Sequence, residues 1–222
     1  MKLQFIANIY MLFCSTIALG YGLSKILSRK KTAAYFTFSV FAVLCVVLSR
    51  LYYSVSVICF DEVPQIFNLG FLGYFAMFMF IFFSNYGQID KLVDDRKSLK
   101  PVYRIVPSIL SVIELFFGIA AVVYGTADIS VCISFLIMTV LAGWAGYFNI
   151  KHIIVPDVDF GIAQSIRGYN FTALLIEVLS LVEVGLSCFD IIEPIIWVEA
   201  VLGILYLAVL PILYKGVKKW IQ

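Results

Sequence analysis

Residues 28–59 read SRKKTAAYFTFSVFAVLCVVLSRLYYSVSVIC, a basic loop followed by one long apolar run. From Ala34 to Cys59 a single charged residue, Arg50, interrupts this run. A helix needs about 20 predominantly apolar residues to cross the hydrocarbon core of a bilayer. The stretch therefore predicts a transmembrane helix that carries a guanidinium group inside the membrane.

The rest of the chain repeats this pattern of apolar runs and short polar loops. The 222 residues are 63% hydrophobic and 14% charged, whereas soluble domains average about 45–50% apolar and about 25% charged residues. The predicted spans are residues 4–27, 34–59, 66–87, 104–124, 129–149, 167–189 and 194–214. We predict an all-α polytopic membrane protein, a seven-transmembrane helix bundle in which residues 1–222 form one domain embedded in the lipid bilayer.

The distribution of Lys and Arg predicts the orientation of this bundle. Of the 16 Lys and Arg residues, all except Lys2 and Arg50 fall in or beside alternate loops and the C-terminal tail. The only charged residues of the intervening loops are acidic, such as Asp61 and Asp128. Because cytoplasmic loops are enriched in Lys and Arg, we expect the N-terminus outside and the C-terminus in the cytoplasm.

Five Arg and Glu residues lie well inside the predicted spans, away from the span ends, where charges are costly and mark functional sites. They are Arg50, Glu114, Glu177, Glu183 and Glu199. A helical rise of about 1.5 Å per residue places Arg50, Glu183 and Glu199 at a similar level in the outer half of the bundle. We expect Arg50 to pair with Glu183 or Glu199, because an unpaired guanidinium there is very unfavourable.

This polar layer has two interpretations. In the first, the layer surrounds a ligand cavity whose floor is formed by Glu114 and Glu177, which lie near the middle of their spans. Tyr52, Tyr53 and Trp197 neighbour the layer in sequence, and we expect them to line that cavity. In the second interpretation, an ion pair only fastens helices together, and the aromatic residues face lipid or the membrane interface.

Motifs for common membrane enzymes are absent from the sequence. His152 is the only histidine and falls in a predicted cytoplasmic loop, so the spans lack the ligands of a zinc hydrolase and the base of a Ser-His protease. The sequence contains no P-loop and no GxGxxG, and its basic residues form no nucleic-acid-binding face. We expect no catalytic residue, no metal and no cofactor, and a protein that is not an enzyme.

The stretch from Ser84 to Tyr103, SNYGQIDKLVDDRKSLKPVY, is the longest polar segment that interrupts the spans. It contains Asp90, Asp94, Asp95 and Arg96. The spacing of the acidic residues indicates a cytoplasmic extension of the third span. These residues form either a docking surface for a cytoplasmic or membrane protein partner or a solvated loop.

The seven short-looped helices, N-out and C-in, resemble the seven-helix sensory region of bacterial histidine kinases. The resemblance covers the whole chain and rests on architecture, with the nearest local match where the aromatic third span runs into Tyr86-Gly87-Gln88-Ile89-Asp90. It implies a sensory protein in a bacterial plasma membrane. The chain departs from that family because it ends at Gln222 without a kinase domain, so we expect signalling through a separate protein.

Three hypotheses for function follow from these features. The first is a receptor-like sensory protein that binds a small molecule in the outer half of the bundle and acts through a partner. The second is a small transporter or channel that uses the intramembrane carboxylates. The third is a structural subunit of a membrane complex.

Overall fold

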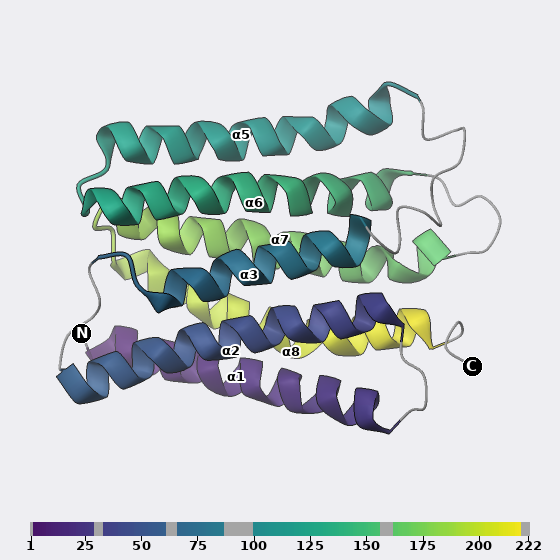
Figure 1. Ribbon diagram of the computed structural model, residues 1–222, viewed down its shortest axis with the longest axis horizontal. Helices are drawn as coiled ribbons and strands as arrows, with labels where there is room; N and C mark the ends of the chain where they lie inside the picture. The colour runs from purple at the N-terminus through teal and green to yellow at the C-terminus, as the bar shows by residue number, and fades with distance from the viewer. Residues whose placement is uncertain (1, 29–32, 61–65, 87–99, 156–161, 219–222) are drawn as a thin grey trace.

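The computed structural model describes residues 2–28, 33–60, 66–86, 100–155 and 162–218. Within these ranges the chain forms seven helices that run side by side and alternate in direction (Figure 1). They are α1 (Lys2–Leu27), α2 (Ala34–Phe60), α3 (Leu69–Ser84), α5 (Val102–Tyr124), α6 (Ile129–Ile154), α7 (Ile162–Cys188) and α8 (Glu193–Val217). The predicted all-α bundle of seven helices is confirmed.

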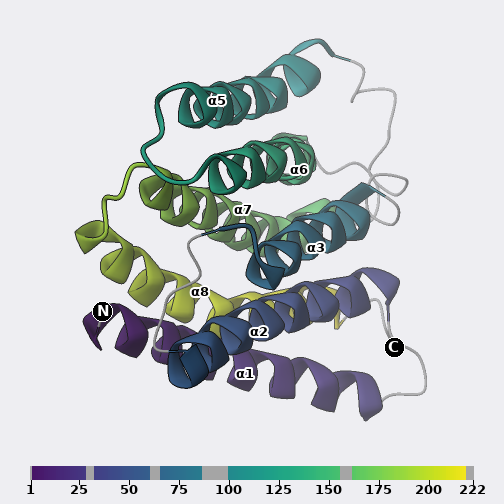
Figure 2. The same cartoon turned by 60° about the vertical axis from the view of Figure 1, so that its left-hand side comes forward.

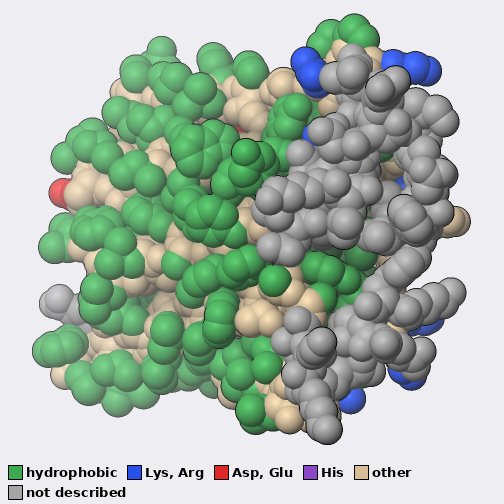
Figure 3. All heavy atoms as spheres, turned by 45° about the vertical axis from the view of Figure 1, so that its right-hand side comes forward, with side chains coloured by type: hydrophobic (Ala, Val, Ile, Leu, Met, Phe, Trp, Pro, Cys, Tyr) green, Lys and Arg blue, Asp and Glu red, His purple; other side chains and the backbone are tan. Residues whose placement is uncertain are grey.

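The helices have the length and the surface of an integral membrane protein. Six of them, all except α3, are long and apolar enough to cross a bilayer. Figure 3 shows hydrophobic side chains covering the flank of the bundle, with Lys and Arg gathered toward one end. Basic residues stand in the last turns of α1, α6 and α8, at the end of the bundle that also holds the C-terminus (Figure 1). N-out orientation remains a prediction.

The bundle is elongated in cross-section, with α5 at one edge and α1 at the other (Figure 2). The α5 helix packs mainly on α6, and α6 packs on α7 and α3. On the opposite side α1 contacts α2 and α8, while α7 joins the two sides through its contacts with α6 and α8. This central position of α7 allows its two faces to serve two different groups of side chains.

Polar side chains fix several helix ends. The Asp128 carboxylate caps α6 by accepting from the Ser130 backbone N–H at 2.8 Å, and its hydrogen bonds with Ser130 lower the pKa of Asp128. Asn68 caps α3 in the same way, by accepting from the Gly70 backbone N–H. After α7, Asp190 adopts a left-handed conformation with φ of 55°, which lets the Ile191 N–H reach the Leu186 carbonyl at 3.0 Å.

Three predicted spans differ from the observed helices by several residues. The α3 helix begins at Leu69 instead of at residue 66, because Asn68 caps its start, and a π-helical turn over Asn85 and Tyr86 follows Ser84, with Asn85 fully buried. The fifth loop is shorter than predicted, because α6 continues to Ile154 and α7 already begins at Ile162. His152 therefore lies within α6 with 0% exposure, instead of in a loop.

Candidate functional site

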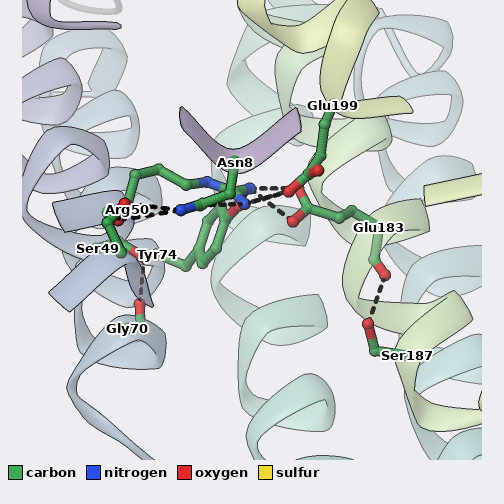
Figure 4. A network of polar contacts seen from close by, with 9 residues as sticks. Asn8, Ser49, Arg50, Gly70, Tyr74, Glu183, Ser187 and Glu199 are labelled. Carbon is green, nitrogen blue, oxygen red and sulfur yellow. Dashed lines mark hydrogen bonds and ion pairs between the residues drawn. The ribbon is translucent and has the colours of Figure 1, made fainter. Parts of the chain in front are cut away.

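The predicted polar layer forms a group of five side chains that we call the arginine cluster: Asn8, Arg50, Tyr74, Glu183 and Glu199 (Figure 4). The Arg50 side chain leaves α2 and reaches both predicted carboxylates at once. Its Nη2 donates to Glu183 on α7 and its Nη1 donates to Glu199 on α8, each at 2.6 Å. Arg50 therefore forms ion pairs with both Glu183 and Glu199, instead of with one of the two.

Two further helices join the arginine cluster through neutral side chains. The Tyr74 hydroxyl of α3 accepts from Arg50 Nη2 and donates to Glu183 Oε2 at 3.0 Å. Asn8 of α1 accepts from Arg50 Nη1 through its Oδ1 at 3.4 Å and donates to Ser54 Oγ at 2.9 Å. One guanidinium group consequently connects five helices.

The arginine cluster contains one carboxyl group more than guanidinium groups. Arg50 is 2% exposed and Glu199 is 3% exposed, so water does not screen these charges well. Glu199 Oε2 is buried, and the part of the chain that the structure describes supplies it with no hydrogen-bond partner. Because buried carboxylates need compensation, the cluster is suited to take up one additional positive charge.

A second buried polar group, the carboxyl chain, consists of Glu114, Glu177, Asn149, Asn85 and His152. Asn149 Nδ2 donates to Glu177 Oε2 at 3.2 Å, and Asn85 Nδ2 donates to Asn149 Oδ1 at 2.7 Å. His152 Nδ1 lies 3.3 Å from Asn85 Oδ1. Four of these side chains are 0% exposed and Glu114 is 6% exposed. The carboxyl chain is therefore a buried row of polar side chains that extends from the middle of α7 toward the last turn of α6.

Small residues on α6 create the space for the two carboxyl groups. A Cβ added at Gly143 would lie 3.5 Å from Glu114 Oε2, and one added at Gly146 would collide with Glu177 Oε1. Positions three apart are neighbours on one helix face, so α5 and α7 present their carboxyl groups to adjacent sites on α6. Both oxygens of Glu114 and Oε1 of Glu177 are buried, and no hydrogen-bond partner for them lies among the described residues.

The structure divides the predicted site residues between these two groups. Arg50, Glu183 and Glu199 meet as predicted, whereas Glu114 and Glu177 belong to the separate carboxyl chain. Tyr52 and Tyr53 are half-buried and form a ring pair with centroids 6.1 Å apart, and Tyr53 also packs against Gly70 of α3. Trp197 is 76% exposed, which places it on the outside of α8.

Sequence reasoning missed Asn8, Tyr74, Asn149 and Asn85 and misplaced His152. Tyr74 stood within a run of aromatic residues that gives no sign of its direction, and neutral amides do not stand out in an apolar helix. Asn85 and Asn149 both stand at the ends of apolar runs. Because buried amides require hydrogen-bond partners, their presence there could have indicated a contact between the third and fifth spans. The predicted docking residues Asp90, Asp94, Asp95 and Arg96 lie outside the described residues.

A small cavity lies between α2, α3, α7 and α8, on the side of Arg50 that faces the C-terminal end of the bundle. Its volume is about 20 Å³, and Ser39, Met77, Tyr169 and Tyr206 contribute to its lining. That volume accommodates about one water molecule. A larger ligand at this level would therefore have to separate the helices.

Comparison of the chain with protein-family models, with curated proteins and with solved structures finds no match.

Proposed function

We propose that this chain is a receptor-like membrane protein in which a small cationic ligand acts on the arginine cluster and a partner protein reads the resulting change. The observation that carries this proposal is the double ion pair of Arg50 with Glu183 and Glu199. Because one side chain fastens α2 to both α7 and α8, any ligand that competes for its carboxylates shifts the packing of three helices.

The charge of the arginine cluster favours a cation as the ligand. Among the described residues, no hydrogen-bond donor reaches Glu199 Oε2. A second positive group beside Arg50 would balance the charge of the second carboxylate in the cluster. A ligand changes an equilibrium between two helix arrangements only through its different affinities for them. In one arrangement the positive group of the ligand takes the place of Arg50 at Glu199. In the other arrangement Arg50 occupies that position, and the ligand does not bind.

Binding of small probe cations to the purified protein in lipid nanodiscs tests this proposal. Choline and putrescine serve as probes and acetate as the anionic comparison, with the melting temperature as the readout. A ligand at about 100 times its Kd stabilises its bound state by about 2.7 kcal/mol. We expect at least one cation to shift the melting temperature of the native chain, no shift with acetate, and loss of the shift in Glu199→Gln.

Glu193→Gln is the matched control, since Glu193 opens α8 and is exposed; it should keep the shift. The same probe is then tested for flux into proteoliposomes. Saturable flux that Glu199→Gln abolishes would make the protein a transporter and contradict the receptor proposal, as would the absence of any shift with cations.

The proposal also requires the arginine cluster to face the outside. Asp128 caps α6 at the same end of the bundle as the N-terminus (Figure 1). In a chain whose exposed Cys59 is replaced by Ser, an impermeant thiol reagent added to cells should label Asp128→Cys and leave Lys97→Cys unlabelled. The reverse pattern would place the cluster in the cytoplasmic half and overturn this part of the proposal.

A further inference from the structure

The carboxyl chain contains two buried carboxyl groups for which the described residues supply no cation. Among the described residues, no donor reaches either oxygen of Glu114, and Asn149 is the side-chain donor to Glu177. Isolated buried carboxylates are strongly disfavoured in an apolar medium, and two adjacent ones disfavour each other further. Something positive must therefore reside with this pair.

The ligand set is more suitable for a proton than for a metal ion. Calcium and magnesium take six or more oxygen ligands, whereas within the described ranges no third His, Cys, Asp or Glu side chain joins the two carboxyl groups. A proton needs only the two groups, which share it as paired carboxyls do when like charges cannot both ionise.

A polar route leads from this pair to one end of the bundle. The side chains of Asn149 and Asn85 continue from Glu177 to His152, which stands in the last turn of α6. The charged side chains that the same helices bring to that end are Arg104, Lys151 and Arg167, and Arg167 donates to the Val155 carbonyl at 3.2 Å. On the far side of α7, Glu183 faces Arg50 and is already paired.

We propose that Glu114 and Glu177 together hold one proton, which exchanges with the solution at the C-terminal end of the bundle along Asn149, Asn85 and His152. On uptake, a hydronium ion that enters from that end, hydrogen-bonded by the neutral side chains of Asn85 and Asn149, gives its proton to a carboxylate oxygen of the pair and leaves as water. Release is the reverse, with water as the acceptor. Intramembrane carboxyl and histidine groups in such lines are typical of proton pathways. The proposal is independent of the receptor hypothesis, because no residue of the arginine cluster takes part.

Infrared spectroscopy of the full chain in nanodiscs tests the proton site, since a protonated carboxyl group has its own C=O stretching band. Near neutral pH we expect this band in the native chain, with the same intensity in sodium and in choline buffers. Glu114→Gln and Glu177→Gln should each change the frequency or intensity of this band, because the remaining buried carboxyl group stays neutral without its neighbour. The double variant should remove the band, and the exposed-site control Glu193→Gln should leave it unaltered. A band that survives unchanged in the double variant, or no band in the native chain, would overturn the proposal.

Transfer of the native chain into D₂O tests the route, because deuterium shifts the same band. Asn149→Leu should slow this shift by about tenfold, since the route loses a hydrogen-bonding step. Asn170→Leu is the matched control, because Asn170 is equally buried on α7 and its side-chain amide has no hydrogen-bond partner within the described ranges; it should leave the rate unchanged. Equal rates in the native chain and Asn149→Leu would refute the route.

If the substituted chains fail to fold, infrared measurements on the native chain alone still test the proton site. A native band that disappears when sodium replaces choline identifies a sodium site and refutes the proton site. A sodium-independent native band that exchanges in D₂O while the backbone amides of the helices stay protected supports it. An exchange no faster than that of the amides would show that the carboxyl group is reached only by unfolding.

Discussion

The arginine cluster and the carboxyl chain lie on the same central helix, α7, yet they handle buried charge in different ways. In the cluster, Glu183 lies 2.6 Å from a guanidinium group that also pairs with Glu199. In the carboxyl chain, Glu177 accepts a hydrogen bond from the neutral amide of Asn149, and Glu114 occupies the neighbouring position against α6. Six residues separate Glu177 from Glu183, which turns them about 240° apart around the helix.

This difference shows how one apolar helix serves two purposes. A charge paired by a fixed cation connects helices and holds them together, because separating the pair leaves two buried charges. A carboxyl group without a fixed cation has to acquire a mobile one. The arginine cluster thus fastens α2 to α7 and α8, whereas the carboxyl chain is the site at which we propose reversible proton binding.

The comparison predicts its largest effect at Arg50. Arg50→Met leaves Glu183 and Glu199 buried without a cation, and breaking a buried pair costs about 3–5 kcal/mol. Chemical unfolding in detergent micelles, followed by circular dichroism, should show this loss. Glu114→Gln, on the carboxyl chain, should cost far less, because no fixed partner loses its pair. Equal losses of unfolding free energy in Arg50→Met and Glu114→Gln would contradict the distinction between a paired and an unpaired buried charge.

Tyr74→Phe should have the next largest effect, because it removes a hydroxyl group that bonds both Arg50 and Glu183. Hydrogen bonds to charged groups contribute about 1.5–3 kcal/mol each, so we expect a loss in that range by the same unfolding measurement. Tyr124→Phe is the matched control, since Tyr124 is 75% exposed. A loss no greater than in that control would remove Tyr74 from the cluster.

The carboxyl chain is sensitive to the space that α6 leaves for it. Gly146→Ala places a methyl group on Glu177 Oε1, and overpacking of this kind costs about 1–3 kcal/mol. At Gly20 of α1 an added Cβ meets nothing within 4 Å, so Gly20→Ala should stabilise the helix by about 0.5–1 kcal/mol. Thermal melting of the two variants should move in opposite directions; parallel shifts would speak against a tight site at Gly146.

The smallest effect concerns Asp128, an exposed charge outside both regions. Its hydrogen bonds with Ser130 lower the pKa of the carboxyl group below the ordinary value of 3.8. A carboxylate with a lowered pKa contributes stability above its ordinary pKa, and this contribution is lost as the pH falls through the folded-state pKa. The melting temperature of the native chain should therefore fall relative to that of Asp128→Asn, which retains a capping oxygen but does not titrate, only at strongly acidic pH. A difference that stays constant with pH would contradict this.

Much of the fold follows from the sequence, because hydrophobic runs of about 20 residues leave few alternatives to transmembrane helices. The shared level of Arg50, Glu183 and Glu199 also follows, since helical rise converts sequence position into depth. Rotation of each helix about its axis does not follow. The α3 helix is apolar on all sides, so the sequence gives no indication that Tyr74 points inward.

The membership of the carboxyl chain depends on the same missing rotation. The sequence predicts that Glu114 and Glu177 form the floor of one cavity, because both lie near the middle of their spans. The structure instead brings them to α6, where Gly143 and Gly146 leave room for their side chains. Spacing alone did not reveal this, because small residues three or four apart occur in many membrane helices.

The central claim is that Arg50 compensates two carboxylates at once, and a combined substitution tests it most directly. Relative to Arg50→Met, the triple variant Arg50→Met, Glu183→Gln, Glu199→Gln removes every charge of the cluster and should recover most of the lost unfolding free energy. Each double variant, Arg50→Met with Glu183→Gln or Arg50→Met with Glu199→Gln, should recover only part of it, since one buried carboxylate remains. Full recovery in either double variant, or a triple variant no more stable than Arg50→Met, would contradict the double ion pair.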